Sequence, residues 1–314
     1  MSETELQRLS SILNELHELL SSYVLFIARF DDKIRVIENS RDASELEQDS
    51  NYWVTVVYRN ALIRLRLILE NNFLTLETLG VLATTRYVFE TLVWLRKMER
   101  EPNYSLVFYG KVIGDQLQQR KDYKAKVEAE IAVFEKFQKE ENSLHEDALK
   151  QMKDHGSNVS AEHVSGATAF VMNEMDRRSR RAFSLYAKDA KQNGFGFQAH
   201  LLREQAIPQI DAQIDELVRE KAKFTGGSAP PVRKKVEERW NWKAEAMSVG
   251  MQAQYEFIYS HTSRLLHATP SSILTDQKNL EVQEMAMFLD YVYVSLLDVL
   301  DLAGRQVGPV GKTH

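Results

Sequence analysis

The sequence predicts an all-α protein, a helical bundle with a long helical-hairpin-like insertion. Only 13 Gly and 6 Pro occur among 314 residues, so the turns that a many-stranded β protein needs are scarce. Hydrophobic residues make up 44% and charged residues 27%, as in ordinary globular proteins. The first thirty residues carry apolar side chains at heptad spacing, which is typical of a long packed helix.

The first expected helix contains the heptad pattern. Its apolar positions recur at intervals of three and four, at Leu6, Leu9, Leu13, Leu16, Leu20, Tyr23, Ile27 and Phe30. Such a seam predicts packing along another helix, in this chain or in a second one. Residues 38–51 are polar and are expected to form a connection.

Helical patterns follow along the rest of the chain. They are expected over residues 52–79, 81–99, 104–153, 168–191, 198–224, 232–268 and 276–303. Gly80 is expected to separate two of these helices, Pro208 to kink one, and Gly304 to end the last. Residues 225–231, TGGSAPP, are typical of a linker.

The pattern of helices suggests a domain organisation. Residues 1–102 and 232–304 are expected to form the bundle core, because their helices are the most apolar. Residues 103–231 form a charged helical insertion or arm with a thin apolar stripe at Val127, Ile131 and Phe134. Residues 305–314 are expected to be a flexible tail.

Composition and motifs narrow the function classes. The net charge of −5 favours no general attraction to nucleic acid or acidic membranes. The absence of cysteine excludes disulfides, zinc thiolates and cysteine nucleophiles. Phosphate-binding glycine loops and metal-binding His-Glu-x-x-His or Glu-x-x-His pairs are also missing. We therefore expect no cofactor, no metal and no membrane span, and a cytoplasmic location.

Arg86 and Glu90 are the only charged residues in the apolar run 79–95. They lie four residues apart, and on a helical wheel apolar side chains occupy most other directions. A buried ion pair adds little net stability compared with apolar residues, so another role can retain it. Two interpretations remain open: a pair that fixes helix register, or a functional Arg86 that faces a cleft and is oriented by Glu90.

A polar ridge follows the predicted helix near residues 255–270. Glu256, Ser260, Ser263, Arg264 and His267 fall on neighbouring positions of one face. His267 could act as a general acid or base or pair with a phosphate. Alternatively, His267 caps the helix end and the serines bond back to carbonyl groups.

Two basic clusters could contact nucleic acid. Residues 177–181 read RRSRR, and residues 233–243 interleave Trp240 and Trp242 with basic side chains. Glu237 and Glu238 partly cancel the positive charge of the second cluster. Runs of charged residues on helices often do no more than face solvent.

Residues 83–95, ATTRYVFETLVWL, and 255–272, YEFIYSHTSRLLHATPSS, resemble a bacterial all-helical family of unknown function. That family pairs an early Arg-x-x-x-Glu helix with a late Tyr-Ser…His segment, and it is distantly similar to HEPN-type bundles of toxins and phage-defence systems. Many HEPN proteins are dimeric, metal-independent ribonucleases. The resemblance implies functional roles for Arg86, Glu90, Tyr259, Ser260 and His267. The HEPN signature spaces its Arg and His more widely than Arg264 and His267, so catalysis would require Arg86 to face His267 from another helix.

Three functions are therefore expected as alternatives. In the first, RNA is cleaved without metal, with Arg86, Glu90 and His267 as catalytic residues and Tyr259, Ser260 and Arg264 as substrate-binding residues. In the second, the chain is an interaction module that binds a partner or forms a homodimer through the 103–231 arm. In the third, it binds RNA or DNA without catalysis through the basic clusters.

Overall fold

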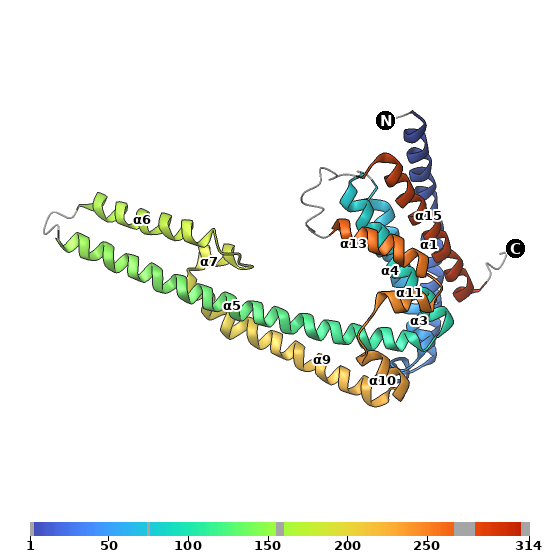
Figure 1. The fold of residues 1–314 in the computed structure, drawn as a ribbon. Helices are drawn as coiled ribbons and strands as arrows, with labels where there is room; N and C mark the ends of the chain where they lie inside the picture. Colours follow the sequence, from blue (N-terminus) through green and yellow to red (C-terminus); the bar gives the residue numbers. More distant parts are fainter. Residues whose placement is uncertain (1–2, 74–75, 155–159, 267–279, 309–314) are drawn as a thin grey trace. The chain divides into compact units, whose positions relative to one another are not determined.

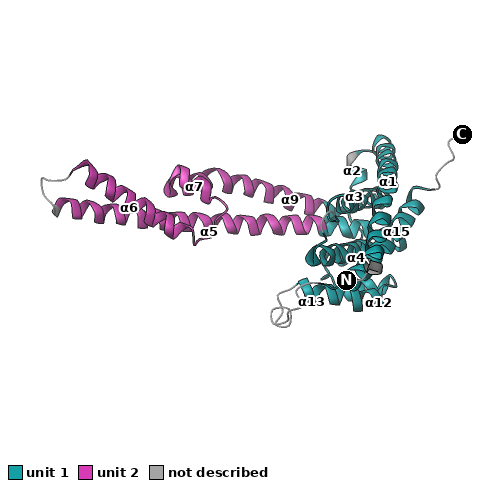
Figure 2. Ribbon diagram, turned by 90° about the horizontal axis from the view of Figure 1, so that it is seen from above, with its two compact units in different colours: residues 1–111, 224–314 teal, residues 112–223 magenta. Residues whose placement is uncertain are grey.

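The computed structural model of the protein describes residues 3–73, 76–154, 160–266 and 280–308. Every element in these ranges is a helix, which confirms the all-α prediction (Figure 1). The chain divides into two compact units, residues 1–111 with 224–314 and residues 112–223 (Figure 2). We call them unit 1 and unit 2. No described helix is long and apolar enough to cross a membrane.

Four long helices form the core of unit 1. Helix α1, Glu3–Ser40, packs on α3, Ser50–Asn71, and on α15, Val282–Val307, and α15 packs in turn on α4, Thr78–Arg100. The partners of the predicted seam are therefore helices of the same chain. Because α1 contacts two helices, its buried stripe is wider than a heptad seam and includes Ile12 and Leu19, whereas Leu6 is 44% exposed.

Two buried tyrosines connect these helices. The hydroxyl of Tyr23 donates to the carbonyl oxygen of Leu296 at 3.1 Å, and that of Tyr58 donates to the carbonyl oxygen of Leu95 at 3.0 Å. Burial raises the pKa of both hydroxyls, so both stay protonated and able to donate. Each tyrosine thus buries a large ring without leaving its polar atom unsatisfied.

Several predicted helix ends of unit 1 are corrected. The short helix α2, Ala43–Leu46, lies in the expected connection. Helix α3 ends at Asn71 and α4 begins at Thr78, so Gly80 lies inside α4 and does not separate two helices. Gly304 lies inside α15, which continues to Val307 and is followed by Gly308 at a φ of 78°, a conformation that favours glycine.

The continuous helix predicted over residues 232–268 is wrong. The structure has instead α10, Pro230–Glu237; α11, Trp242–Ser248; α12, Gln252–Gln254; a π-helical turn η3, Tyr255–Tyr259; and α13, Ser260–Leu266. The side chain of Asn241 caps α11 by accepting a hydrogen bond from the Ala244 N–H, and Gly250 has a φ of 76°. These local signals outweigh the helical period. The expected linker shrinks to Ser228 and Ala229, because α9, Ile207–Gly227, and α10 include the rest.

Unit 2 is built from the greater part of α5, Tyr104–Asp154, with α6, Ala161–Ser179; α7, Ala187–Asn193; α8, Phe195–Leu201; a π-helical turn η2, Leu202–Ala206; and most of α9. The single helix predicted over 168–191 is therefore two helices. The predicted stripe of Val127, Ile131 and Phe134 is buried in a core of its own. Pro208 follows η2, where its missing N–H favours a π-helical turn over a regular helix.

A buried carboxylate fastens the segment between α6 and α7 onto α5. The side chain of Glu130 is only 1% exposed, and it accepts hydrogen bonds from Lys126 Nζ at 2.6 Å, from the Leu185 N–H at 3.1 Å and from the Ser184 hydroxyl. Burial alone would raise the pKa of Glu130, but these donors outweigh it and hold the pKa below its usual value. The carboxylate is thus ionised, and its oxygens accept hydrogen bonds from three groups of unit 2.

We predict that unit 2 loses stability in acid through Glu130. Its pKa is lower in the folded than in the unfolded chain, so its contribution is complete above the unfolded pKa and is lost as the pH falls through the folded pKa. Glu130→Gln should lower the free energy of unfolding by about 1–3 kcal/mol at pH 7 and by less in acid. Urea unfolding between pH 3 and pH 7 measures both values. The exposed Glu128→Gln serves as control, and an equal loss in both variants would contradict the assignment.

Two glycines one turn apart on α5 should respond in opposite ways to alanine. A Cβ at Gly110 would lie 2.6 Å from Phe224 Cε1 and 2.7 Å from Val236 Cγ2, whereas a Cβ at Gly114 meets no atom within 4 Å. Gly110→Ala should destabilise unit 1 by about 1–3 kcal/mol through overpacking. Gly114→Ala should stabilise the helix by about 0.5–1 kcal/mol. Thermal unfolding of both variants tests this, and a stable Gly110→Ala would show that α5 and α10 are not packed closely.

Candidate functional site

Helix α4 presents Arg86 and Glu90 on the side covered by η3 and α13. Their side chains are 26% and 25% exposed, so the pair is half-buried. Around them α4 is strongly apolar, and Val88, Phe89 and Leu92 are buried. The pair is therefore neither sealed in the core nor fully exposed, and the neighbouring Tyr87 is 38% exposed.

The guanidinium of Arg86 has two partners. Nε donates to Glu90 Oε1 at 2.8 Å, and Nη2 donates to the hydroxyl of Tyr259 at 3.0 Å. The Arg86 Cζ atom also lies 4.6 Å from the centre of the Tyr259 ring, close enough for a cation–π contact. The structure therefore brings Tyr259 from a distant part of the sequence to the Arg86–Glu90 pair. We call Arg86, Glu90 and Tyr259 the Arg86 centre.

The charges of the Arg86 centre are well defined. Burial lowers the pKa of Arg86, but the hydrogen bond and charge of Glu90 outweigh this effect. The pKa of Arg86 is therefore raised, and its guanidinium stays protonated. Burial raises the pKa of Tyr259, and the nearby Arg86 opposes that rise only in part. Tyr259 is therefore a neutral hydroxyl. It accepts from Arg86, and its own proton can be donated to another group.

The π-helical turn η3 positions Tyr259. Tyr255 and Tyr259 lie at its two ends with their rings stacked, 5.0 Å apart and inclined by 17°. Phe89 of α4 lies 5.7 Å from the Tyr259 ring, and Trp242 of α11 lies 6.0 Å from it. Aromatic contacts from three elements thus fix the ring to which Arg86 binds. Single π-helical turns occur frequently at functional sites.

The other predicted site residues have different positions. The Ser260 hydroxyl donates to the carbonyl oxygen of Tyr255 at 3.3 Å, as in the alternative that the ridge serines bond backward. Arg264 is exposed on α13 and has no ion-pair partner among the described residues. His267 lies outside the described residues, directly after the last residue of α13. The hydroxyl oxygen of Ser263 is buried without a described hydrogen-bond partner.

Sequence reasoning missed the aromatic surroundings of the Arg86 centre. Trp240 stacks on Trp94 with ring centres 3.8 Å apart, and Trp242 packs edge-on against both. These indoles fill the space between α4 and α11 and do not form a free stacking surface for bases. The i,i+4 spacing of Tyr255 and Tyr259 was the one signal that pointed to this cluster.

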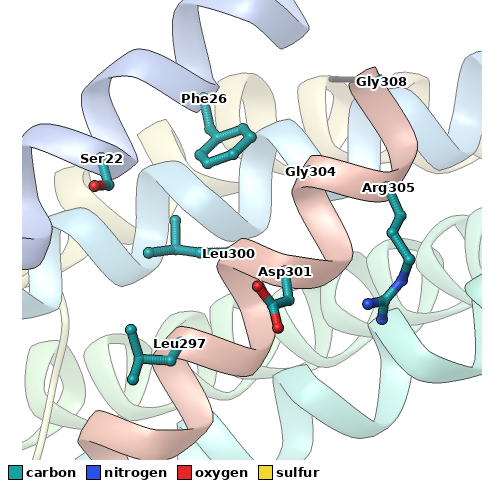
Figure 3. A pocket seen from close by; sticks show the side chains of 8 residues that line it. All are labelled: Ser22, Phe26, Leu297, Leu300, Asp301, Gly304, Arg305 and Gly308. Atoms are coloured by element: carbon teal, nitrogen blue, oxygen red, sulfur yellow. The ribbon is translucent and has the colours of Figure 1, made fainter. Parts of the chain in front are cut away.

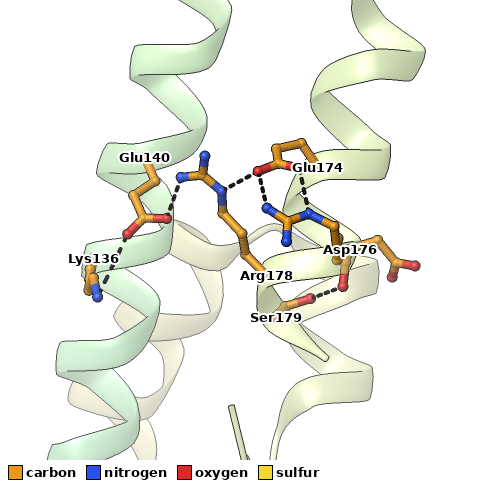
Figure 4. A network of polar contacts seen from close by, with 7 residues as sticks. Lys136, Glu140, Glu174, Asp176, Arg178 and Ser179 are labelled. Carbon is orange, nitrogen blue, oxygen red and sulfur yellow. Dashed lines mark hydrogen bonds and ion pairs between the residues drawn. The ribbon is translucent and has the colours of Figure 1, made fainter. Parts of the chain in front are cut away.

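The basic cluster at 177–181 is largely neutralised. Arg177 and Arg178 both bind Glu174, and Arg178 also reaches Glu140 of α5 at 3.0 Å (Figure 4). Arg180 binds Asp176. This cluster belongs to unit 2, whereas residues 233–243 belong to unit 1. Such pairing leaves little unbalanced charge for a phosphate backbone.

The described ranges hold no cluster of three or more His, Asp or Glu side chains arranged to bind a metal ion. A hollow of about 730 Å³ lies between α1 and α15, where Phe26, Leu297 and Leu300 surround Gly304 (Figure 3). Asp301 and Arg305 supply its charged groups, and Arg305 already pairs with Glu99. It is open to solvent and separate from the Arg86 centre, so it adds no chemistry to that site.

Comparison of the chain with protein-family models, with curated proteins and with solved structures finds no significant match.

Proposed function

We propose that unit 1 binds a phosphate group of RNA at the Arg86 centre and that the chain cleaves the RNA without a metal ion in the cytoplasm. The observation that carries this proposal is the state of Arg86. Its Nε and Nη2 atoms are held by Glu90 and Tyr259, while Nη1 donates to no described residue. A fixed, partly exposed guanidinium with a spare edge suits the oxygens of a phosphate.

The neutral hydroxyl of Tyr259 supports the same ligand. Because it accepts from Arg86, its proton is directed elsewhere and can reach a second phosphate oxygen. Two preorganised donors on one phosphate would stabilise the charge that builds up in the transition state. Glu90 does not touch the ligand in this arrangement and instead orients Arg86.

The proposed reaction uses the 2′-hydroxyl of the RNA as nucleophile. Its oxygen forms a bond to the adjacent phosphorus while the bond to the 5′-oxygen breaks, and one proton leaves the nucleophile as another reaches the leaving oxygen. His267 is the proposed group for one of these transfers. Its proposed role rests on the sequence, in which it directly follows the last residue of α13, and α13 packs on α4. Such an activity matches the HEPN-like resemblance and a role in toxin or defence systems.

A second candidate is a non-catalytic interaction module. It is favoured by the exposed apolar side chains of α6, where Val164, Phe170 and Met172 are 48%, 61% and 66% exposed. Scattered apolar residues are normal on surfaces, but several on one helix favour a partner protein or a second copy of the chain.

We predict that Arg86→Ala lowers RNA cleavage in EDTA by about a hundredfold or more, as the loss of one transition-state donor does elsewhere. Arg66→Ala is the matched control, since Arg66 and Glu70 form another i,i+4 pair with similar exposure on α3 of the same unit. Cleavage of total RNA and of a short oligonucleotide measures the effect. Circular dichroism and thermal unfolding show whether each variant is folded.

The outcomes separate the candidate functions. Equal cleavage by Arg86→Ala and Arg66→Ala would exclude Arg86 from the reaction. A wild-type protein that cuts no RNA but binds it, with binding lost only in Arg86→Ala, would exclude catalysis and retain phosphate binding. A protein that neither cuts nor binds RNA would leave the interaction module as the better account.

We also predict that His267→Ala lowers cleavage without weakening RNA binding, because His267 would transfer a proton and Arg86 would hold the phosphate. His261→Ala is the control, since His261 lies on α13 and packs against Phe257 and Phe288. Single-turnover rates and dissociation constants, measured separately, test this. Unchanged rates in His267→Ala would contradict the assignment.

A further inference from the structure

Unit 2 contains an apolar cavity of about 470 Å³ between α5, α6 and the segment that leads through α7 to α8. Its walls include Phe134 and Phe137 of α5, Met172 and Met175 of α6, and Phe195 of α8. Phe195 lies 5.2 Å from Phe137 and 6.2 Å from Phe134, ring centre to ring centre. The volume falls in the range of small-molecule sites, which are mostly apolar with a few polar groups.

The rim of this cavity carries an excess of positive charge. Arg180, Lys188 and Lys191 line it, against the carboxylates of Asp176 and Glu141. Asp176 is used by both Arg180 and Lys191, the second at 2.8 Å. Lys188 is exposed, and neither Lys188 nor Glu141 forms an ion pair with any described residue. The three cations outnumber the two carboxylates, so the lining keeps one positive charge in excess.

From these observations we propose that unit 2 binds a small amphipathic anion, with an apolar chain or ring system in the cavity and its carboxylate or sulfonate at Lys188. A purely apolar ligand would not pair with the positive charge at the rim. A cationic ligand would be repelled by Arg180, Lys188 and Lys191. The apolar walls supply most of the affinity, because burying apolar surface is the main favourable contribution, and Lys188 selects the charge of the head group.

The buried hydrogen bonds of Glu130 hold one wall of the cavity in place. Ser184 lines the cavity and donates to Glu130, whose other donors are Lys126 and the Leu185 N–H. The hydroxyl and carboxylate are therefore already satisfied and do not compete for the ligand. This site shares no residue with the Arg86 centre, so the two proposals can fail independently.

The experiment uses the full chain and three ligands: 8-anilinonaphthalene-1-sulfonate, decanoate and its uncharged analogue decanol. The fluorescence of 8-anilinonaphthalene-1-sulfonate reports its binding during a titration. Decanoate binding is measured by the displacement of this bound fluorophore. Met172→Glu places a negative charge on an exposed wall residue, and Lys188→Glu reverses the rim charge. Val164→Glu, on the same helix, and Lys139→Glu, on α5, are matched controls, since neither residue lines the cavity.

The proposal predicts one saturable site for the fluorescent probe. Decanoate should displace the probe, and decanol should displace it at least about tenfold less well. Met172→Glu and Lys188→Glu should each weaken binding of both anions by about tenfold or more, the size of effect expected for a charge at the head group. The two control variants should bind like the wild type. Binding that is not saturable, or that falls equally in Val164→Glu and Lys139→Glu, would overturn the proposal. So would decanol binding as well as decanoate.

Discussion

The half-buried charge of Arg86 is the constraint on which the proposed site depends. A guanidinium taken partly out of water needs hydrogen-bond partners, since an unpaired buried charge is strongly destabilising. Glu90 supplies one from the next turn of α4, and Tyr259 supplies the other from η3. Satisfying Arg86 therefore ties a late segment of the chain to α4. The same contact leaves one edge of the guanidinium available to a ligand.

The sequence allowed the all-α class, the long first helix and the Arg86–Glu90 pair to be predicted. These features depend on local periodicity, which one sequence displays directly. The breaks between residues 232 and 268 were not predicted. They depend on the cap at Asn241, the positive φ of Gly250 and the stacking of Trp240 on Trp94, and the last of these is a tertiary contact.

The Arg86 centre was predicted only in part, for the same reason. A regular helix placed Ser260 and His267 on one ridge, without Tyr259, and the π-helical turn at Tyr255–Tyr259 changes which side chains share a face. The Ser260 hydroxyl donates to the carbonyl oxygen of Tyr255, while Tyr259 reaches Arg86. In unit 2, the apolar stripe of α5 was visible in the sequence. The burial of Glu130 was not, because its partners Ser184 and Leu185 come from a distant turn.

The most direct test of the central claim is a double-mutant cycle for RNA affinity. Arg86→Ala, Tyr259→Phe and the double variant are compared with the wild type by their dissociation constants for a short single-stranded RNA in EDTA. If Arg86 and Tyr259 hold one phosphate together, the two losses should be non-additive by about 1 kcal/mol. Additive losses, or affinities that none of the variants changes, would contradict the claim that these two residues form one phosphate-binding centre.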